Sequence, residues 1–154
     1  MSLIPYGKQF IDRSDTIAVI KALKKEKITT GDEVKKFENK ISHFLKTKYV
    51  ISCNSGTSAI FLALSSIGIK KEDNIIMPSV NFISSYNVAK LLGAKVYLAD
   101  IDKNTGQMTP ENVIQCCYKF KLKKVKAIIT MYIGGCPYNA EKFTKLKKKF
   151  NSII

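Results

Sequence analysis

From residue 49 onward the sequence alternates between short apolar segments and longer amphipathic ones. Runs of β-branched and apolar residues predict strands, and each is followed by a segment with helical spacing. Such alternation is typical of parallel strands joined by crossover helices that cover both faces of the sheet. We therefore predict an α/β fold, a three-layer α/β/α arrangement with a mainly parallel sheet of at least four strands. The expected strands are 49–53, 74–77, 95–99 and 125–130, and the expected helices are 58–67, 82–92, one that starts at Thr109-Pro110-Glu111, and 139–150.

Two amphipathic segments precede this alternation. The first, 14–25, has Ser14 as its expected N-cap, and the second runs from Asp32 to about Leu45. The one histidine, His43, falls on the apolar face of the second segment, where we expect it to be packed in the core. We divide the chain into an N-terminal helical arm, residues 1–46, and part of a larger domain, residues 47–154.

Charge and composition narrow the classes of function. The 154 residues carry a formal net charge of +14, but all 26 basic residues except Arg13 are lysine. Because base and phosphate recognition favours the arginine fork, nucleic acid is a weak candidate partner. No apolar run approaches the roughly 20 residues of a membrane span, and the start lacks the pattern of a signal peptide. The four cysteines form neither a CxxC pair nor a disulfide framework, which favours the cytoplasm, and no metal site is expected.

The turn Asn54–Ser58 lies where the first expected strand passes into a helix. Free backbone amides and the helix dipole make such a position an anion site, and Gly56 allows close approach of a phosphate. The turn has neither the glycine spacing of a dinucleotide fingerprint nor the lysine of a P-loop. Taken alone, it is equally well explained as capping chemistry.

Further polar and aromatic residues follow the other strands, at the edge where parallel sheets bind ligands. Phe82 stands among small polar residues after the second strand, where its ring would stack on a planar cofactor or, alternatively, join the core. Asp100 and Asp102 follow the third strand. The fourth is followed by Tyr132, Gly134 and Gly135.

Several motifs in order resemble the DegT/DnrJ/EryC1/StrS family of sugar aminotransferases, fold-type I enzymes that use pyridoxal 5′-phosphate (PLP). These are IPYGKQFIDRSDTIAVIKAL, ITTGDEVKKFENKISHFL, SGTSA, DNIIMPSVNFISSYNVAKLLGAKVYLADID and KAIITMYIGGCPYNAEK. Asp32 stands where the family usually has proline. The resemblance covers the whole chain and is nearest to the branch that aminates nucleotide-linked 4-keto-6-deoxy sugars. It implies that residues 47–154 are part of a PLP-binding large domain.

The resemblance assigns roles by position. Ser55, Gly56 and Thr57 would hold the PLP phosphate, and Phe82 would stack on the pyridine ring. Tyr6 and the segment Ile28, Thr29, Thr30 and Gly31 would approach the nucleotide-sugar substrate. The family also implies a homodimer and an amino-acid donor, glutamate being the expected one.

Other family features have no counterpart here. The motif whose aspartate pairs with the pyridine nitrogen is expected directly after Ser152-Ile153-Ile154, which start a further strand, and the cofactor-binding lysine lies further on. The chain therefore contains no predicted catalytic residue. We expect the 154 residues alone to bind PLP weakly or not at all and not to transaminate. The alternative is a non-catalytic remnant that acts as a folded or partner-binding module.

Overall fold

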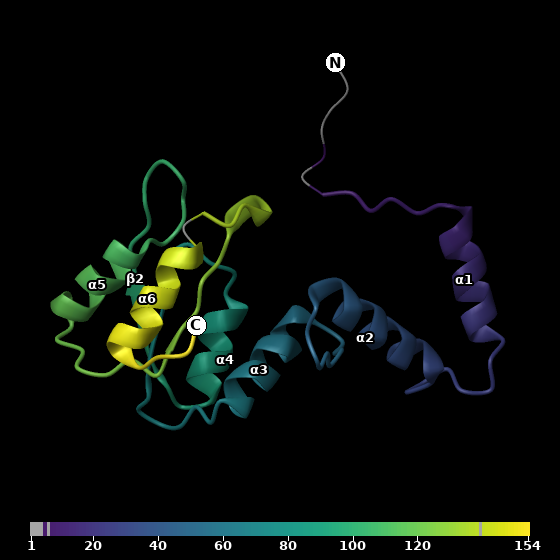
Figure 1. The fold of residues 1–154 in the computed structure, drawn as a ribbon, viewed down its shortest axis with the longest axis horizontal. Helices are drawn as coiled ribbons and strands as arrows, with labels where there is room; N and C mark the ends of the chain where they lie inside the picture. The colour runs from purple at the N-terminus through teal and green to yellow at the C-terminus, as the bar shows by residue number, and fades with distance from the viewer. Residues whose placement is uncertain (1–4, 6, 139) are drawn as a thin grey trace, which may run out of the picture. The chain divides into compact units, whose positions relative to one another are not determined.

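The computed structural model describes residues 5, 7–138 and 140–154, in two compact units, 1–52 and 53–154. The first unit contains α1 (Arg13–Leu23), drawn in purple in Figure 1, and α2 (Asp32–Leu45), drawn in blue. Neither helix buries a residue, and His43 is exposed, with Nδ1 2.7 Å from the Asn39 carbonyl oxygen. The prediction of a packed core position for His43 is therefore wrong.

The start of α1 also differs from the prediction. Asp12, and not Ser14, is the N-cap: its carboxylate accepts from the N–H groups of Ser14 at 2.6 Å and Asp15 at 3.1 Å. The Asp15 carboxylate in turn accepts from the Asp12 N–H at 2.9 Å, which completes a capping box. The helix thus starts at Arg13 because an aspartate at this position satisfies two of the free amides at once.

The expected strand 49–53 is absent from the part of the chain that the structure describes. The segment has no ladder partner, and the N–H and hydroxyl of Ser52 both donate to the Glu38 carboxylate at 2.8 Å. A β-branched run satisfies its backbone as a strand only where a neighbouring strand is available. The prediction of a strand here is wrong for this structure.

The second unit has the predicted three layers. A parallel sheet in the order β2-β1-β3 is built from β1 (Asn74–Pro78), β2 (Lys95–Ala99) and β3 (Ala127–Ile128). The helices of this unit are α3 (Gly56–Ser66), α4 (Ser84–Leu91), α5 (Pro110–Lys119) and α6 (Ala140–Phe150), with a 3-10 turn at Ile133–Gly135. The sheet has three strands, so the expected count of at least four was too high. Ile153 adds one parallel bridge to Ala127, where a further strand was expected to begin.

Alternating side chains of the sheet separate two buried clusters. Ile75, Met77 and Ala127 pack against residues of α3 and α4, such as Leu64 and Val88. On the other face, Ile76 and Ile128 pack against residues of α5 and α6 (Val113, Cys116, Cys117, Phe143 and Leu146). Ile75 and Ile76 are adjacent in sequence and both fully buried, one in each cluster. This is the two-residue period of a strand covered on both faces.

The helices of the second unit end in a common way. After α3, α4, α5 and α6 one residue takes a left-handed conformation, and the next residue donates its N–H to the carbonyl five positions earlier, as in a Schellman motif. Gly68 and Gly93 fill this position after α3 and α4, but Lys121 fills it after α5 with φ 52°. The start of α5 also follows the prediction, with Thr109 as N-cap and Pro110 at the first helical position.

Candidate functional site

The N-terminus of α3 presents two backbone N–H groups that have no acceptor in the part of the chain that the structure describes. Ser55 is the N-cap, and its hydroxyl accepts from the Ser58 N–H at 3.2 Å. The Ser58 hydroxyl donates to Asn54 Oδ1 at 2.7 Å. Among the described residues, the N–H groups of Gly56 and Thr57 have no acceptor, and both residues are exposed. The cap therefore uses one amide of the turn and leaves two without an acceptor among the described residues.

The space in front of this turn is open. A Cβ built on Gly56 would meet nothing within 4 Å, so the glycine leaves room for a group that approaches the backbone. The donor set of two amides and the Thr57 hydroxyl suits a phosphate. These features fit the phosphate of PLP, the cofactor that the resemblance implies.

Phe82 lies in the loop that follows β1, next to Ile83, the N-cap of α4. Its side chain is 68% exposed, and it lines a small cavity of about 80 Å³ together with Pro78, Asn81 and Tyr86. The alternative that Phe82 is a core residue does not hold in this unit. The Asn81 Nδ2 atom beside it is buried and has no hydrogen-bond partner among residues 5, 7–138 and 140–154.

The helix that begins at Gly56 (α3) and the helix that follows Phe82 (α4) are neighbours in one layer. α3 packs against α4, and the turns after the two helices meet at the amino ends of the strands. Both helices therefore begin toward the carboxyl ends of the strands, the edge where parallel sheets bind ligands. The structure brings the Gly56–Thr57 amides and the Phe82 region to this common edge.

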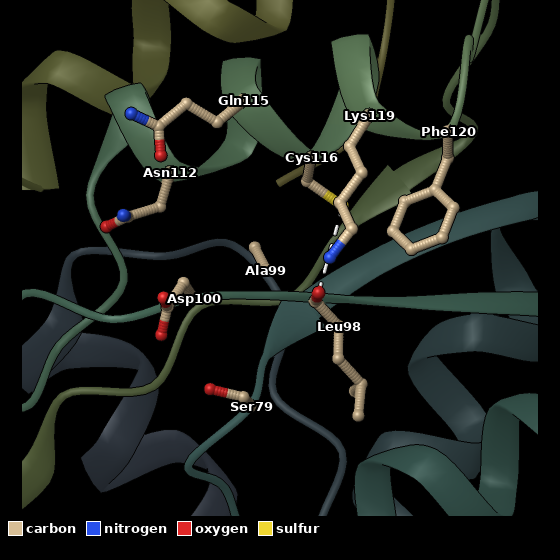
Figure 2. Close-up of a pocket in the computed structure, with 9 residues that line it drawn as sticks. All are labelled: Ser79, Leu98, Ala99, Asp100, Asn112, Gln115, Cys116, Lys119 and Phe120. Carbon is tan, nitrogen blue, oxygen red and sulfur yellow. Dashed lines mark hydrogen bonds between the residues drawn. The ribbon is translucent and has the colours of Figure 1, made fainter.

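A second cleft of about 410 Å³ lies at the carboxyl ends of β1 and β2. Figure 2 shows Ser79 and Asp100 from the strand ends facing Asn112, Gln115 and Lys119 of α5. Asp100 was a predicted candidate, whereas the three α5 residues were not predicted from the sequence. Their spacing of three and four residues along one helix face is the signal that would have found them.

The Asp102 carboxylate, by contrast, accepts hydrogen bonds from residues of its own turn. Its carboxylate accepts from the Thr105 N–H at 2.9 Å, the Thr105 hydroxyl at 3.1 Å and the Asn104 N–H at 3.0 Å. These donors, chiefly the Thr105 N–H, lower the pKa of Asp102. Tyr132, Gly134 and Gly135 lie at the 3-10 turn after β3, where both glycines have positive φ.

The predicted substrate residues belong to the first unit. Tyr6 lies outside the described residues. Ile28, Thr29 and Thr30 are exposed, and Gly31 is the N-cap of α2. A Cβ on Gly31 would lie 2.7 Å from the Lys27 carbonyl oxygen, so only glycine fits there.

Other reactive groups are few in the part of the chain that the structure describes. No three His, Cys, Asp or Glu side chains gather there in a way that could hold a metal ion. Burial raises the pKa of the Cys116 thiol to about 11 and also raises that of Cys117, so neither is a ready nucleophile. Among the described helices, none has both the length and the apolar character required to cross a bilayer.

A parallel sheet covered on both faces, with an open turn of free amides toward its carboxyl edge, defines an α/β domain. The sequence profile of the DegT/DnrJ/EryC1/StrS aminotransferase family matches residues 9–154. The chain belongs to this family.

Relatives of known activity share about a third of the residues. A UDP-4-amino-4,6-dideoxy-N-acetyl-beta-L-altrosamine transaminase of Campylobacter jejuni (serotype O:23/36) is 34% identical over 149 residues, which are 97% of this chain and 39% of the relative. GDP-perosamine synthase of Escherichia coli O157:H7 is 32% identical over 80% of this chain and 33% of its own length. The chain thus spans well under half the length of these relatives.

Solved structures give the same match. An aminotransferase from Psychrobacter cryohalolentis superposes with a TM-score of 0.86 at 26% identity, over 97% of this chain and 38% of the other. The PLP form of a chain assigned as a sugar aminotransferase from Streptococcus pneumoniae gives a TM-score of 0.82 at 26% identity, over 98% of this chain and 38% of the other. The fold is therefore that of the N-terminal part of these aminotransferases.

Proposed function

We propose that this chain is the N-terminal part of a PLP-dependent aminotransferase that transfers an amino group from glutamate to a nucleotide-linked keto sugar. The product would enter cell-surface polysaccharide or glycan biosynthesis. The observation that carries the proposal is the pair of unsatisfied amides at Gly56 and Thr57 in a chain of this family. The activities named for the Campylobacter and Escherichia relatives support the choice of substrate class.

In this account Gly56 and Thr57 bind the cofactor phosphate through their N–H groups and the Thr57 hydroxyl, and the Ser55 cap keeps the turn in place. Phe82 covers one face of the ring and excludes water from it. When bound, PLP supplies an electron sink for breaking and making bonds at the carbon that carries nitrogen. The residues named here bind and orient; none of them moves a proton.

We place the remaining parts of the site outside residues 1–154. These are the lysine that holds the cofactor and the aspartate that pairs with the ring nitrogen. The 154 residues alone are therefore expected not to transaminate. Tyr6 and residues 28–31 are proposed to contact the nucleotide sugar. We further propose, from the family resemblance, that the protein is a homodimer. We also propose that it works in the cytoplasm, since the four cysteines suggest no disulfide framework.

Titration with pyridoxamine 5′-phosphate tests the cofactor proposal. This form has no aldehyde and does not react with the many surface lysines, so any binding is non-covalent. Thr57→Ala should weaken binding several-fold, because it removes one hydroxyl donor to a charged acceptor. Thr144→Ala on α6 is the matched control, since that exposed hydroxyl donates only to the Glu141 carbonyl. Equal affinity for pyridoxamine without the phosphate would contradict the proposal.

A further inference from the structure

A cleft of about 340 Å³ lies between the C-terminal half of α5, the turn after it and the end of α6. α5 and α6 lie side by side, in green and yellow in Figure 1, on the sheet face opposite α3 and α4. The cleft is therefore separate from the proposed cofactor site, and nothing in that site accounts for it.

The floor of the cleft is apolar. Ile114, Leu122 and Phe150 pack against the buried cluster of this face but stay partly exposed on their outer side. Tyr118 stands at the edge with 76% of its surface exposed. Water in contact with this floor is released when an apolar group covers it, which favours binding of such a group.

The rim is cationic. Lys121, Lys123 and Lys149 line the cleft, and the Lys149 ammonium lies 5.6 Å from the centre of the Phe150 ring. Residues 112–154 contain ten lysines and one acidic residue, Glu141. In the part of the chain that the structure describes, none of these lysines forms an ion pair. The positive charge around the cleft is thus uncompensated.

The backbone of Lys121 shows a further departure from the usual pattern. Lys121 takes the left-handed conformation that glycine normally fills at the end of a helix. Its side chain therefore stands on the rim at a position where glycine would fit the backbone better. This makes Lys121→Gly a useful variant, because it removes a rim charge while keeping the turn.

We propose that this cleft is a docking site for an acidic protein segment in which one large apolar side chain is flanked by aspartate or glutamate residues. The apolar side chain would cover the floor, and the flanking carboxylates would meet the three lysines. Charge complementarity selects an acidic partner. The floor residues stay partly exposed and Tyr118 is largely exposed, whereas sites for small molecules bury most of their ligand, so a side chain of a larger partner suits the cleft better. The single arginine argues against nucleic acid.

Fluorescence polarisation with a labelled peptide tests the proposal. The probe is Asp-Glu-Asp-Phe-Glu-Asp-Glu, and the comparison peptide has alanine in place of phenylalanine. We expect the phenylalanine peptide to bind at least fivefold more tightly in 150 mM salt. The triple variant Lys121→Gly, Lys123→Gln, Lys149→Gln should lose at least tenfold in affinity. The control Lys90→Gln, on α4 of the opposite face, should leave affinity unchanged.

Three results would overturn the proposal. Equal binding of the two peptides would mean that the apolar floor is not used. A proportionate loss of affinity in Lys90→Gln, which removes one charge where the triple variant removes three, would mean that only net charge matters. Tighter binding of duplex DNA or of phosphatidylglycerol vesicles than of the peptide, with the same dependence on the three lysines, would assign the face to nucleic acid or to a membrane. Circular dichroism melts of each variant verify that the fold is kept.

Discussion

The backbone N–H of Glu72 donates to the Gly93 carbonyl oxygen at 3.0 Å, which joins the turn before β1 to the turn before β2. Gly93 has φ 83°, and a Cβ built on it would lie 3.2 Å from the Lys71 Cα. This contact joins the turns after α3 and α4 at one edge of the α3–α4 layer. The first residues of both helices therefore lie toward the opposite edge, where the candidate site lies.

Gly93→Ala should therefore destabilise the second unit. We expect a loss of about 2 kcal/mol in the free energy of unfolding, from the left-handed backbone and the close approach to Lys71 together. Gly68→Ala is the matched control, with φ 68° and nothing within 4 Å of its Cβ, and should cost about 1 kcal/mol. Urea unfolding measures both. Equal losses would mean that the contact with Lys71 is unimportant.

Lys121→Gly should stabilise the same unit. Glycine relieves the left-handed strain at the end of α5, and we expect a gain of about 0.5 kcal/mol after its greater unfolded-state entropy is subtracted. Lys123→Gly, at a position with no positive φ, should give no gain. A loss of stability in Lys121→Gly would contradict the observed end of the helix.

Ile76 is the fully buried residue of β1 that faces α5 and α6. Ile76→Ala should cost about 2–5 kcal/mol, because the surrounding side chains only partly fill the cavity that it leaves. Leu62→Ala, at a position 47% exposed on α3, should cost much less. Thermal melts followed by circular dichroism compare the two, and similar losses would show that Ile76 is not a core residue.

Titration of Asp102 should make the free energy of unfolding depend on pH, and the direction of its pKa shift gives the sign of that dependence. The pKa of this carboxyl is lowered in the folded state, chiefly by the Thr105 N–H. A lowered folded-state pKa contributes stability at pH values above the unfolded pKa, and that contribution is lost as pH falls below about 4. Asp102→Asn keeps an acceptor oxygen but does not titrate, so its stability should fall less steeply between pH 5 and pH 2. Identical slopes in the two proteins would rule out this contribution.

Thiol labelling distinguishes the four cysteines. Cys53 and Cys136 are exposed, whereas Cys116 and Cys117 are buried with raised pKa values. At pH 8 iodoacetamide should modify the first pair readily and the second pair only after unfolding, because the thiolate is the reactive form. Mass spectrometry of the labelled native protein gives the answer. Rapid modification of Cys116 would contradict its buried position on the inner face of α5.

Much of the fold was predictable because its signals are local. Apolar spacing predicted α2 at its observed bounds, and Thr109-Pro110 predicted the start of α5. The strand predicted at 49–53 is absent from the described part of the chain. A strand needs a pairing partner that is distant in the sequence, and the local pattern carries no information about that partner. Asp12 as N-cap was missed because aspartate and serine are both good caps, and only the backbone decides between them.

The candidate site shows the same division. The Asn54–Ser58 turn was recognised from its composition, but the sequence left open whether its amides would be free. The polar face of α5 that lines the cleft at Asp100 was missed, although Asn112, Gln115 and Lys119 follow helical spacing. Which residues of a helix reach a cleft depends on the packing of that helix, and composition alone does not fix it.

The most direct test of the central claim is the response of two backbone amides to a phosphate-bearing ligand. In ¹⁵N–¹H spectra of the chain titrated with pyridoxamine 5′-phosphate, the Gly56 and Thr57 N–H signals should shift most. Signals of the Phe82 region should follow, and pyridoxamine without the phosphate should leave the two amides unmoved. Shifts that are largest elsewhere, or the same with and without the phosphate, would contradict the assignment of this turn as the cofactor phosphate site.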